Sequence, residues 1–294
     1  MFHRALISFL FLSLFLFFDS NQAKENNKID KSADRTSETS INVDISLGNG
    51  RLFLEKGIND KIFDGEFFYK NNLPDVKYEI VGETGRLTVR FDEQRFKRKG
   101  EENKFTRLSS LDNLYEDECR LKLSPNLPIV LNLDLGLARG ELKFGGLQIK
   151  EIKLTSGVSK TKIDFSEPNP ISLEYFDVEA GVGTLEISNL GNANFKHFKF
   201  DGGIGDYIID FAGDHYLNTK VDIGVGVGKV KIYLPRSAGV RMKVDKSFFC
   251  SFNIDDIYKK DDLYYNDKWG KTDNSLDMNL ETGVGNVSVV WIEE

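Results

Sequence analysis

The sequence has few of the residues on which most catalytic and metal sites depend. Its 294 residues include only three histidines, and one of these, His3, lies in a segment that we expect to be removed. Two cysteines allow at most one disulfide bond. No EF-hand loop, zinc-ligand spacing or nucleophile elbow is present. We therefore expect no catalytic residue, no metal and no cofactor.

Alanine and excess positive charge are also scarce. The chain has eight alanines against 26 glycines and 23 phenylalanines, and its formal net charge is −7. Because alanine is the best helix former, this balance favours strands over helices. A nucleic-acid binder needs a basic face to neutralise phosphates, so the acidic charge excludes that class.

A long apolar run occurs only at the start of the chain. Residues 5–18 carry no charge, and a short polar stretch ending in Ala23 follows them. This pattern predicts a signal peptide over 1–23, with export to the periplasm or the cell surface and no integral membrane span after its removal. An uncleaved anchor is the alternative. Residues 24–40 are almost entirely polar, which predicts a disordered linker.

Glycines mark an internal repeat. A glycine begins the same local pattern six times, at intervals of 21, 24, 22, 23 and 57 residues. A dinucleotide-binding loop would need a third glycine and a following helix, and neither is present. Repeated spacing is instead typical of a stacked architecture. The anchor glycines are Gly136, Gly157, Gly181, Gly203, Gly226 and Gly283.

Apolar residues recur at fixed distances from each anchor glycine. The residues five and three places before it, one place after it and six places after it are apolar in all six units. The first three offsets have the same parity, so we expect them to share one buried strand face, whereas the fourth has the other parity. The chain must turn between them, and glycine suits such a corner because it tolerates positive φ.

These observations predict an all-β protein. Units of about 22 residues have no core of their own, so we expect a β-solenoid or β-helix-like stack, with a β-sandwich of hairpins as the alternative. We expect one domain over 41–294. Residues 41–128 form its looser part, and 129–294 form regular repeats with an insertion over 246–275.

Several segments carry a family resemblance. The stretches 41–52 (INVDISLGNGRL), 63–67, 76–89, 127–136 and 283–289 resemble the bacterial toast-rack family. This resemblance implies a β-rich repeat domain of envelope-associated proteins. The relatives it implies include the extracytoplasmic part of membrane regulators that respond to cell-wall antibiotics. It brings no catalytic residues.

Three groups of residues are candidates for a special role. Aromatic residues stand among acids in the insertion, and they could form a recognition face for protein or glycan, or an end cap on the stack. Cys119 and Cys250 could pair in an exported protein, or remain buried thiols. A metal at Asp210, Asp214 and His215 is a weaker interpretation than a simple turn. The aromatic candidates are Tyr258, Tyr264, Tyr265 and Trp269.

The favoured hypothesis is a non-catalytic exported envelope protein that acts as an interaction or scaffold domain. The alternatives are an adhesin-like binder of glycan or protein, and a carbohydrate-active β-helix enzyme with a carboxylate pair. The expected partners are an envelope protein, cell-wall glycan or a second copy of the chain.

Overall fold

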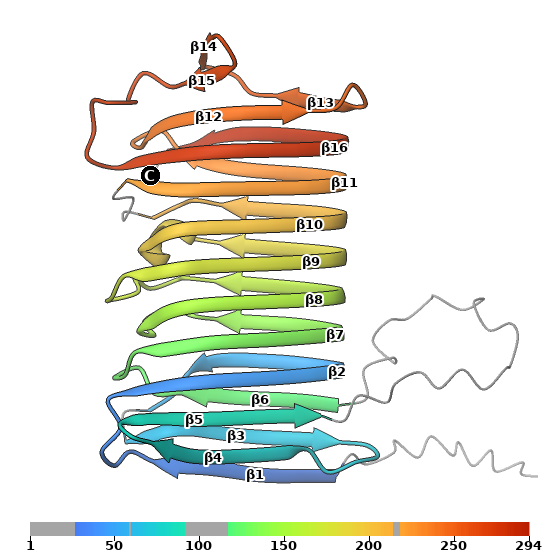
Figure 1. Cartoon of the computed structure of the whole chain (residues 1–294), viewed down its shortest axis with the longest axis vertical. Coiled ribbons are helices and arrows are strands. Elements are labelled where there is room, and N and C mark those ends of the chain that lie inside the picture. Colours follow the sequence, from blue (N-terminus) through green and yellow to red (C-terminus); the bar gives the residue numbers. More distant parts are fainter. Residues whose placement is uncertain (1–26, 59, 92–116, 214–217, 294) are drawn as a thin grey trace, which may run out of the picture.

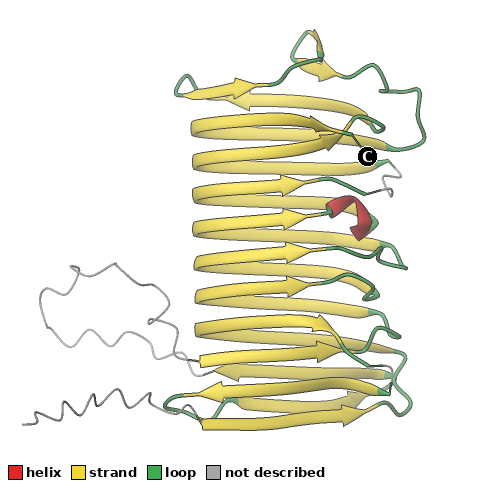
Figure 2. Ribbon diagram, turned by 180° about the vertical axis from the view of Figure 1, so that it is seen from behind, coloured by secondary structure: helices red, strands yellow, loops and turns green. Residues whose placement is uncertain are grey.

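The computed structural model describes residues 27–58, 60–91, 117–213 and 218–293. Within these ranges sixteen strands join one sheet, which runs from β1 at one end to β14 at the other without closing (Figure 1, Figure 2). The prediction of an all-β protein is confirmed. The expected signal peptide over 1–23 lies outside the described residues. No helix of the described part is long and apolar enough to cross a membrane.

The strands differ in length, with the longest in the repeat region. The strands before the repeat are β1 (Asn27–Asp34), β2 (Ser40–Lys56), β3 (Lys61–Tyr69), β4 (Asp75–Val81), β5 (Thr84–Phe91) and β6 (Asp117–Leu123). The repeat strands are β7 (Ile129–Lys143), β8 (Ile149–Asp164), β9 (Leu173–Ser188), β10 (Phe195–Asp210) and β11 (Thr219–Pro235). The rest are β12 (Gly239–Lys246), β13 (Cys250–Asn253), β14 (Tyr258–Lys260), β15 (Leu263–Tyr265) and β16 (Ser275–Ile292), and a 3-10 turn, η2 (Leu190–Ala193), precedes β10.

The repeat strands stack in parallel and in register. β7, β8, β9, β10, β11 and β16 pair in that order, and the anchor-glycine units align rung on rung. Each long strand folds back at its glycine corner, so its two arms lie in two facing layers (Figure 1). The pairing is therefore parallel between units, and not the pairing of hairpins that the sandwich alternative assumes.

The core fills the space between the two layers. The residues five and three places before each anchor, and six places after it, are buried as predicted. Aromatic rings form part of this interior, with Phe176 and Phe198 at a centroid distance of 5.2 Å. Burying one such side chain contributes about 2–3 kcal/mol. Stacking thus supplies the core that a single unit lacks.

One predicted position is wrong. The residue after each anchor glycine was expected on the core face, yet Leu137 is only partly buried, and Val158, Val182, Ile204, Val227 and Val284 are 44–56 % exposed. The chain already begins to turn at the anchor glycine. In β8 to β11, four residues span the corner between the last buried position of one arm and the first of the next. The side chain after the anchor projects from the tip of that corner.

Glycine is required at the corners because backbone passes close to backbone. A Cβ on Gly181 would lie 2.5 Å from the carbonyl oxygen of Gly157 in the rung before. Gly228, two places after its anchor, has φ +146°, and a Cβ there would strike the carbonyl oxygen of Gly205. The structure thus has a corner at the anchor glycines, where close stacking requires glycine, but positive φ occurs two places after the anchor, at Gly183, Gly228 and Gly285.

The N-terminal end corrects the predicted linker. Residues 27–34 form strand β1, which pairs antiparallel with β3, so this part of 24–40 is not disordered. Ile29 and Ala33 alternate along β1 and pack against the core, and Lys28 forms an ion pair with Glu66. Two apolar side chains suffice because neighbouring strands supply the remaining core. The charges along β1 also suit an edge strand, since charge discourages pairing with another chain.

The insertion over 246–275 lies at the other end of the strand order. β12 and β13 together form one rung, because β12 pairs with the first arm of β16 and β13 with its second arm. β15 then pairs with β12, and β14 with β15. β16 is the last strand in sequence, but it lies between β11 and β12. The 57-residue interval thus contains a rung of its own.

Candidate functional site

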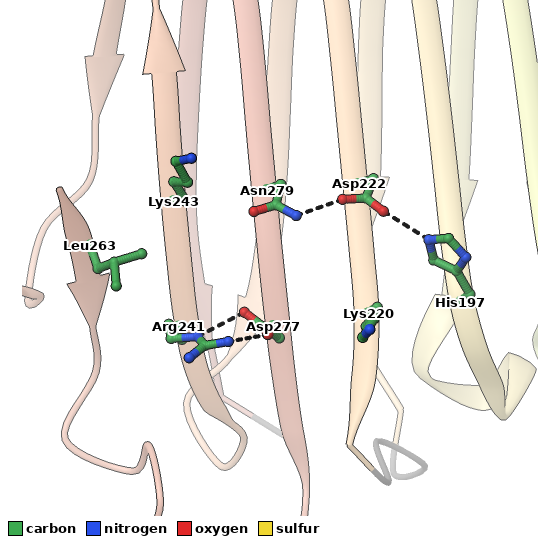
Figure 3. Close-up of a pocket in the computed structure, with 8 residues that line it drawn as sticks. All are labelled: His197, Lys220, Asp222, Arg241, Lys243, Leu263, Asp277 and Asn279. Atoms are coloured by element: carbon green, nitrogen blue, oxygen red, sulfur yellow. Dashed lines mark hydrogen bonds and ion pairs between the residues drawn. The ribbon is translucent and has the colours of Figure 1, made fainter.

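A polar groove lies on the outer face of the stack near this end. Five adjacent strands, β10, β11, β16, β12 and β15, line it with side chains that point away from the core (Figure 3). Register places these side chains in two rows across the strands. The lining residues are His197, Lys220, Asp222, Arg241, Lys243, Leu263, Asp277 and Asn279.

Asp222 on β11 lies at the centre of one hydrogen-bond chain. Its carboxylate accepts a hydrogen bond from Asn279 Nδ2 at 2.7 Å, and His197 Nε2 lies 2.8 Å from its other oxygen (Figure 3). Partial burial is the largest single effect and opposes ionisation, but these hydrogen bonds together with the nearby charge of Lys199 hold the pKa of Asp222 below its ordinary value. The groove therefore presents a fixed carboxylate between an amide and an imidazole.

Arg241 on β12 forms the second fixed group. Its guanidinium donates to both oxygens of Asp277 on β16, with Nε 2.8 Å from Oδ1. The same guanidinium lies over the ring of Trp269, 5.0 Å from its centroid. The hydrogen bond to Asp277 raises the pKa of Arg241 above its ordinary value. A bidentate pair braced by an aromatic ring keeps its donors in one orientation.

The structure separates the aromatic residues proposed from sequence. Tyr264 packs against Phe252 at 5.3 Å and covers the core, as an end cap would. Tyr265 is paired in register with Arg241, so it and Trp269 adjoin the groove. Tyr258 is exposed and faces solvent. Tyr264 is thus placed as the end-cap interpretation expects, whereas Tyr265, Trp269 and Tyr258 remain candidates for a recognition face.

The polar groove residues were missed from the sequence. Each belongs to an outward position of a strand, where the chain carries many Lys, Asp, Glu and Asn residues. The only signal was their register. Aligning the units by their anchors would have placed His197, Lys220 and Asp277 side by side. Their arrangement comes from strand pairing and not from a local motif.

The cysteines are free thiols at opposite ends of the stack. Cys119 lies on β6 and Cys250 on β13, and both are buried, so the proposed disulfide is not formed. Burial raises the pKa of the Cys119 thiol, and the neighbouring charge of Glu118 adds to this. Of the weaker metal candidates, Asp210 ends β10, while Asp214 and His215 lie outside the described residues. Among the described residues no three acidic, histidine or cysteine side chains cluster as metal ligands.

Comparisons with known proteins identify relatives of the chain. Residues 18–188 and 176–233 match the family model of the N-terminal domain of toast_rack (DUF2154). A crystal structure of a candidate cell adhesion protein from Clostridium sporogenes is 22% identical, with a TM-score of 0.46; the match covers 91% of this chain and all of that one. A candidate adhesin from Bacteroides fragilis is 12% identical, with a TM-score of 0.35, and covers 91% of this chain and 99% of its own. No curated protein matches.

Proposed function

This chain belongs to the toast-rack family, and from that premise we propose that it is a non-catalytic envelope protein that binds a carbohydrate in the groove between β10 and β15. We interpret the stack as a β-solenoid that acts as a stiff scaffold, with the groove near one end. Export through the segment 1–23 belongs to the same proposal.

Fixed planar polar groups in the groove are the observation that carries this proposal. A sugar presents neighbouring hydroxyl groups that donate and accept hydrogen bonds together. Asp222 can accept, Asn279 can do both, and the guanidinium of Arg241 can donate, each from a position fixed by a neighbour. Tyr265 and Trp269 beside Arg241 add apolar ring surface for the faces of a sugar ring. A groove with few convergent polar groups and adjoining rings suits such a ligand.

The groove carboxylates support binding over catalysis. A glycoside hydrolase needs one carboxylic acid that stays protonated near neutral pH, so that it can protonate the leaving oxygen. The pKa of Asp222 is shifted the other way, below its ordinary value. Asp277 is held in a bidentate pair with Arg241. Asp222 is therefore suited to be a fixed anion and not a proton donor, and the oxygens of Asp277 are engaged by Arg241.

A binding experiment with cell-wall glycan fragments tests the proposal. We expect calorimetric titration of the purified protein with soluble peptidoglycan and polysaccharide fragments to give saturable binding. Asn279→Ala should weaken this binding by about tenfold, since it removes one hydrogen-bonding group and one of the two side chains that hold Asp222.

A matched variant elsewhere on the outer face serves as the control. Asn132 donates to Asp44 at 2.8 Å, the same amide–carboxylate pair at the far end of the stack. Asn132→Ala should leave binding unchanged. Equal loss in both variants would contradict the groove as the site, and release of reducing ends from the fragments would contradict the non-catalytic assignment.

A further inference from the structure

The glycine corners carry an apolar ridge along one edge of the stack. The side chain after each anchor glycine points out of the corner, and register pairs each one directly with the next. Neighbouring strands lie about 4.8 Å apart, so these side chains contact one another in an unbroken row. We define the ridge as Val158, Val182, Ile204, Val227 and Val284, which are 44–56 % exposed.

Two phenylalanines extend the ridge at its C-terminal end. Lys246 pairs with Thr282 and Cys250 with Gly285, so the loop between them takes the place of the next corner. Phe248 and Phe249 in this loop are 95% and 73% exposed. The loop is held in place, because the Phe249 carbonyl accepts a hydrogen bond from Gly285 N at 3.2 Å. Solvent-exposed aromatic rings beside an apolar row indicate a surface that binds another molecule.

The two flanks of the ridge carry opposite charge. Two places before each anchor the outward residues are acidic or neutral, whereas three places after it three of the six are basic, two are neutral and one is acidic. The acidic flank contains Asp134, Glu179, Asp201 and Glu281, with Asp245 beside Glu281 in β12. The basic flank contains Arg139, Lys160 and Lys229, with Asp206 as its acidic member.

These features fit a second copy of the chain better than other occupants. A 180° rotation about an axis parallel to the stack keeps each rung level with the same rung of the other copy. Asp134 then faces Arg139, and Glu179 and Asp201 lie one rung away from Lys160 and Lys229, while Asp201 and Asp206 form the one like-charged pair at a single level. The same rotation sets two rows of equal spacing side by side and brings the phenylalanines together at one end. An anionic membrane would repel the acidic flank. An added peptide strand would find no free backbone edge, because the corner backbone is already paired within the stack.

We propose that two copies of this protein associate through their ridges, side by side and in the same direction. The association uses the corner edge, and it leaves the groove on the outer face accessible. The dimer would therefore present two grooves at the same level of the stack.

Sedimentation velocity of the full protein over a concentration series tests the proposal. We expect a monomer–dimer equilibrium, and we expect Val182→Lys with Ile204→Lys to raise the dissociation constant by at least about tenfold. Val81→Lys is the matched control, because Val81 is 51% exposed but lies on β4, away from the corners. Unchanged circular dichroism and melting temperature would show that the ridge variant still folds.

Charge reversal tests the orientation. Asp134 and Arg139 flank the same corner, so in the proposed dimer each faces the other residue of the partner copy. Asp134→Arg alone and Arg139→Asp alone should each weaken the dimer, and the double reversal should restore it. A wild-type protein that stays monomeric at about 100 µM, a concentration that detects weak association, would overturn the proposal. So would equal weakening by Val81→Lys, or a monomer that co-sediments with vesicles of phosphatidylcholine and phosphatidylglycerol. Failure of the double reversal to restore association would overturn the parallel orientation.

Discussion

The side chain of Asn169 closes a ring with the backbone of Ile149, twenty residues earlier in the chain. Its Oδ1 accepts a hydrogen bond from Ile149 N at 3.1 Å, and its Nδ2 donates to the Ile149 carbonyl at 2.7 Å. Nδ2 also donates to the Ala193 carbonyl at 3.1 Å. Asn169 is 2% exposed, so one amide joins the loops of three successive units in the interior.

Asn169→Ala should therefore be strongly destabilising. The change leaves three buried backbone groups without this partner, which corresponds to a loss of about 3 kcal/mol. Urea unfolding followed by circular dichroism measures it. Asn192→Ala is the control, because Asn192 makes one such bond, to the Phe165 carbonyl, and should cost about 1 kcal/mol. Equal losses would show that the three-way bridge adds nothing.

The glycine corners give a second prediction, which separates backbone strain from steric overlap. Gly228 and Gly270 both have positive φ, but a Cβ meets Gly205 backbone at the first and nothing within 4 Å at the second. Gly270→Ala should cost about 1 kcal/mol from φ alone. Gly228→Ala should cost clearly more, at least about 3 kcal/mol, because two rungs must move apart. Thermal melts of both variants test this, and similar melting temperatures would contradict the close-stacking argument.

The pair of Tyr78 and Glu38 predicts a pH dependence of stability. Tyr78 donates to the buried Glu38 carboxylate at 2.5 Å. Burial, and then the hydrogen bond to Glu38, raise the pKa of Tyr78 above its ordinary value of 10.0. Stability from this group is therefore present below pH 10 and declines as the pH rises above it, because the unfolded chain ionises first.

Tyr78→Phe should lower the free energy of unfolding at pH 7 by about 1–3 kcal/mol and flatten its decline above pH 10. Urea unfolding of both proteins at pH 7 to 11 measures this difference. Tyr258→Phe, at an exposed tyrosine, should leave both the value and the slope unchanged. A variant as steep as the wild type above pH 10 would show that other groups cause the decline.

The carboxylate of Glu38 also makes the stability depend on pH under acidic conditions. Burial acts to raise the pKa of Glu38, but hydrogen bonds from Tyr78 and Thr36 outweigh it, and the pKa lies below the ordinary 4.5. Its contribution is present above that ordinary value and is lost as the pH falls through the lowered one. Glu38→Gln should thus be less stable than the wild type at pH 7 and lose less stability between pH 5 and 3. The same urea series at acid pH measures it, and parallel curves would contradict this role.

The two thiols give a further prediction. Because Cys119 and Cys250 are buried and unpaired, a maleimide should label neither in the native protein and both after unfolding without reductant. Intact mass spectrometry counts the labels. Absence of labelling after unfolding would show that the cysteines are oxidised to each other.

The sequence predicted the stack because its interior repeats. Apolar residues at fixed offsets from Gly157 or Gly203 can be counted along the chain, and the all-β class follows from them. The exposure of Val158 could not be predicted in this way. Its parity matches the core face, and only the position of the turn, set by backbone contacts between glycines of successive rungs, sends it outward.

The two ends of the stack and the polar groove could not be predicted from the sequence, for a related reason. β1 looks disordered by composition, because it has only Ile29 and Ala33 to bury, and β3 supplies its partner from a later part of the chain. The groove brings His197 and Asn279 together from strands that are distant in sequence. Strand order decides both features. The position of β16 between β11 and β12 is not encoded in any local pattern.

In this position β16 connects β12 to the rest of the stack. β16 is hydrogen-bonded along both edges, to β11 on one side and to β12 and β13 on the other. β12 is therefore separated from β11 by one strand, and only residues 275–292 fill that position. A protein truncated before residue 275 would lack the strand between β11 and β12. A separate peptide with the sequence of residues 275–292 should bind at that position and restore the pairing on both sides.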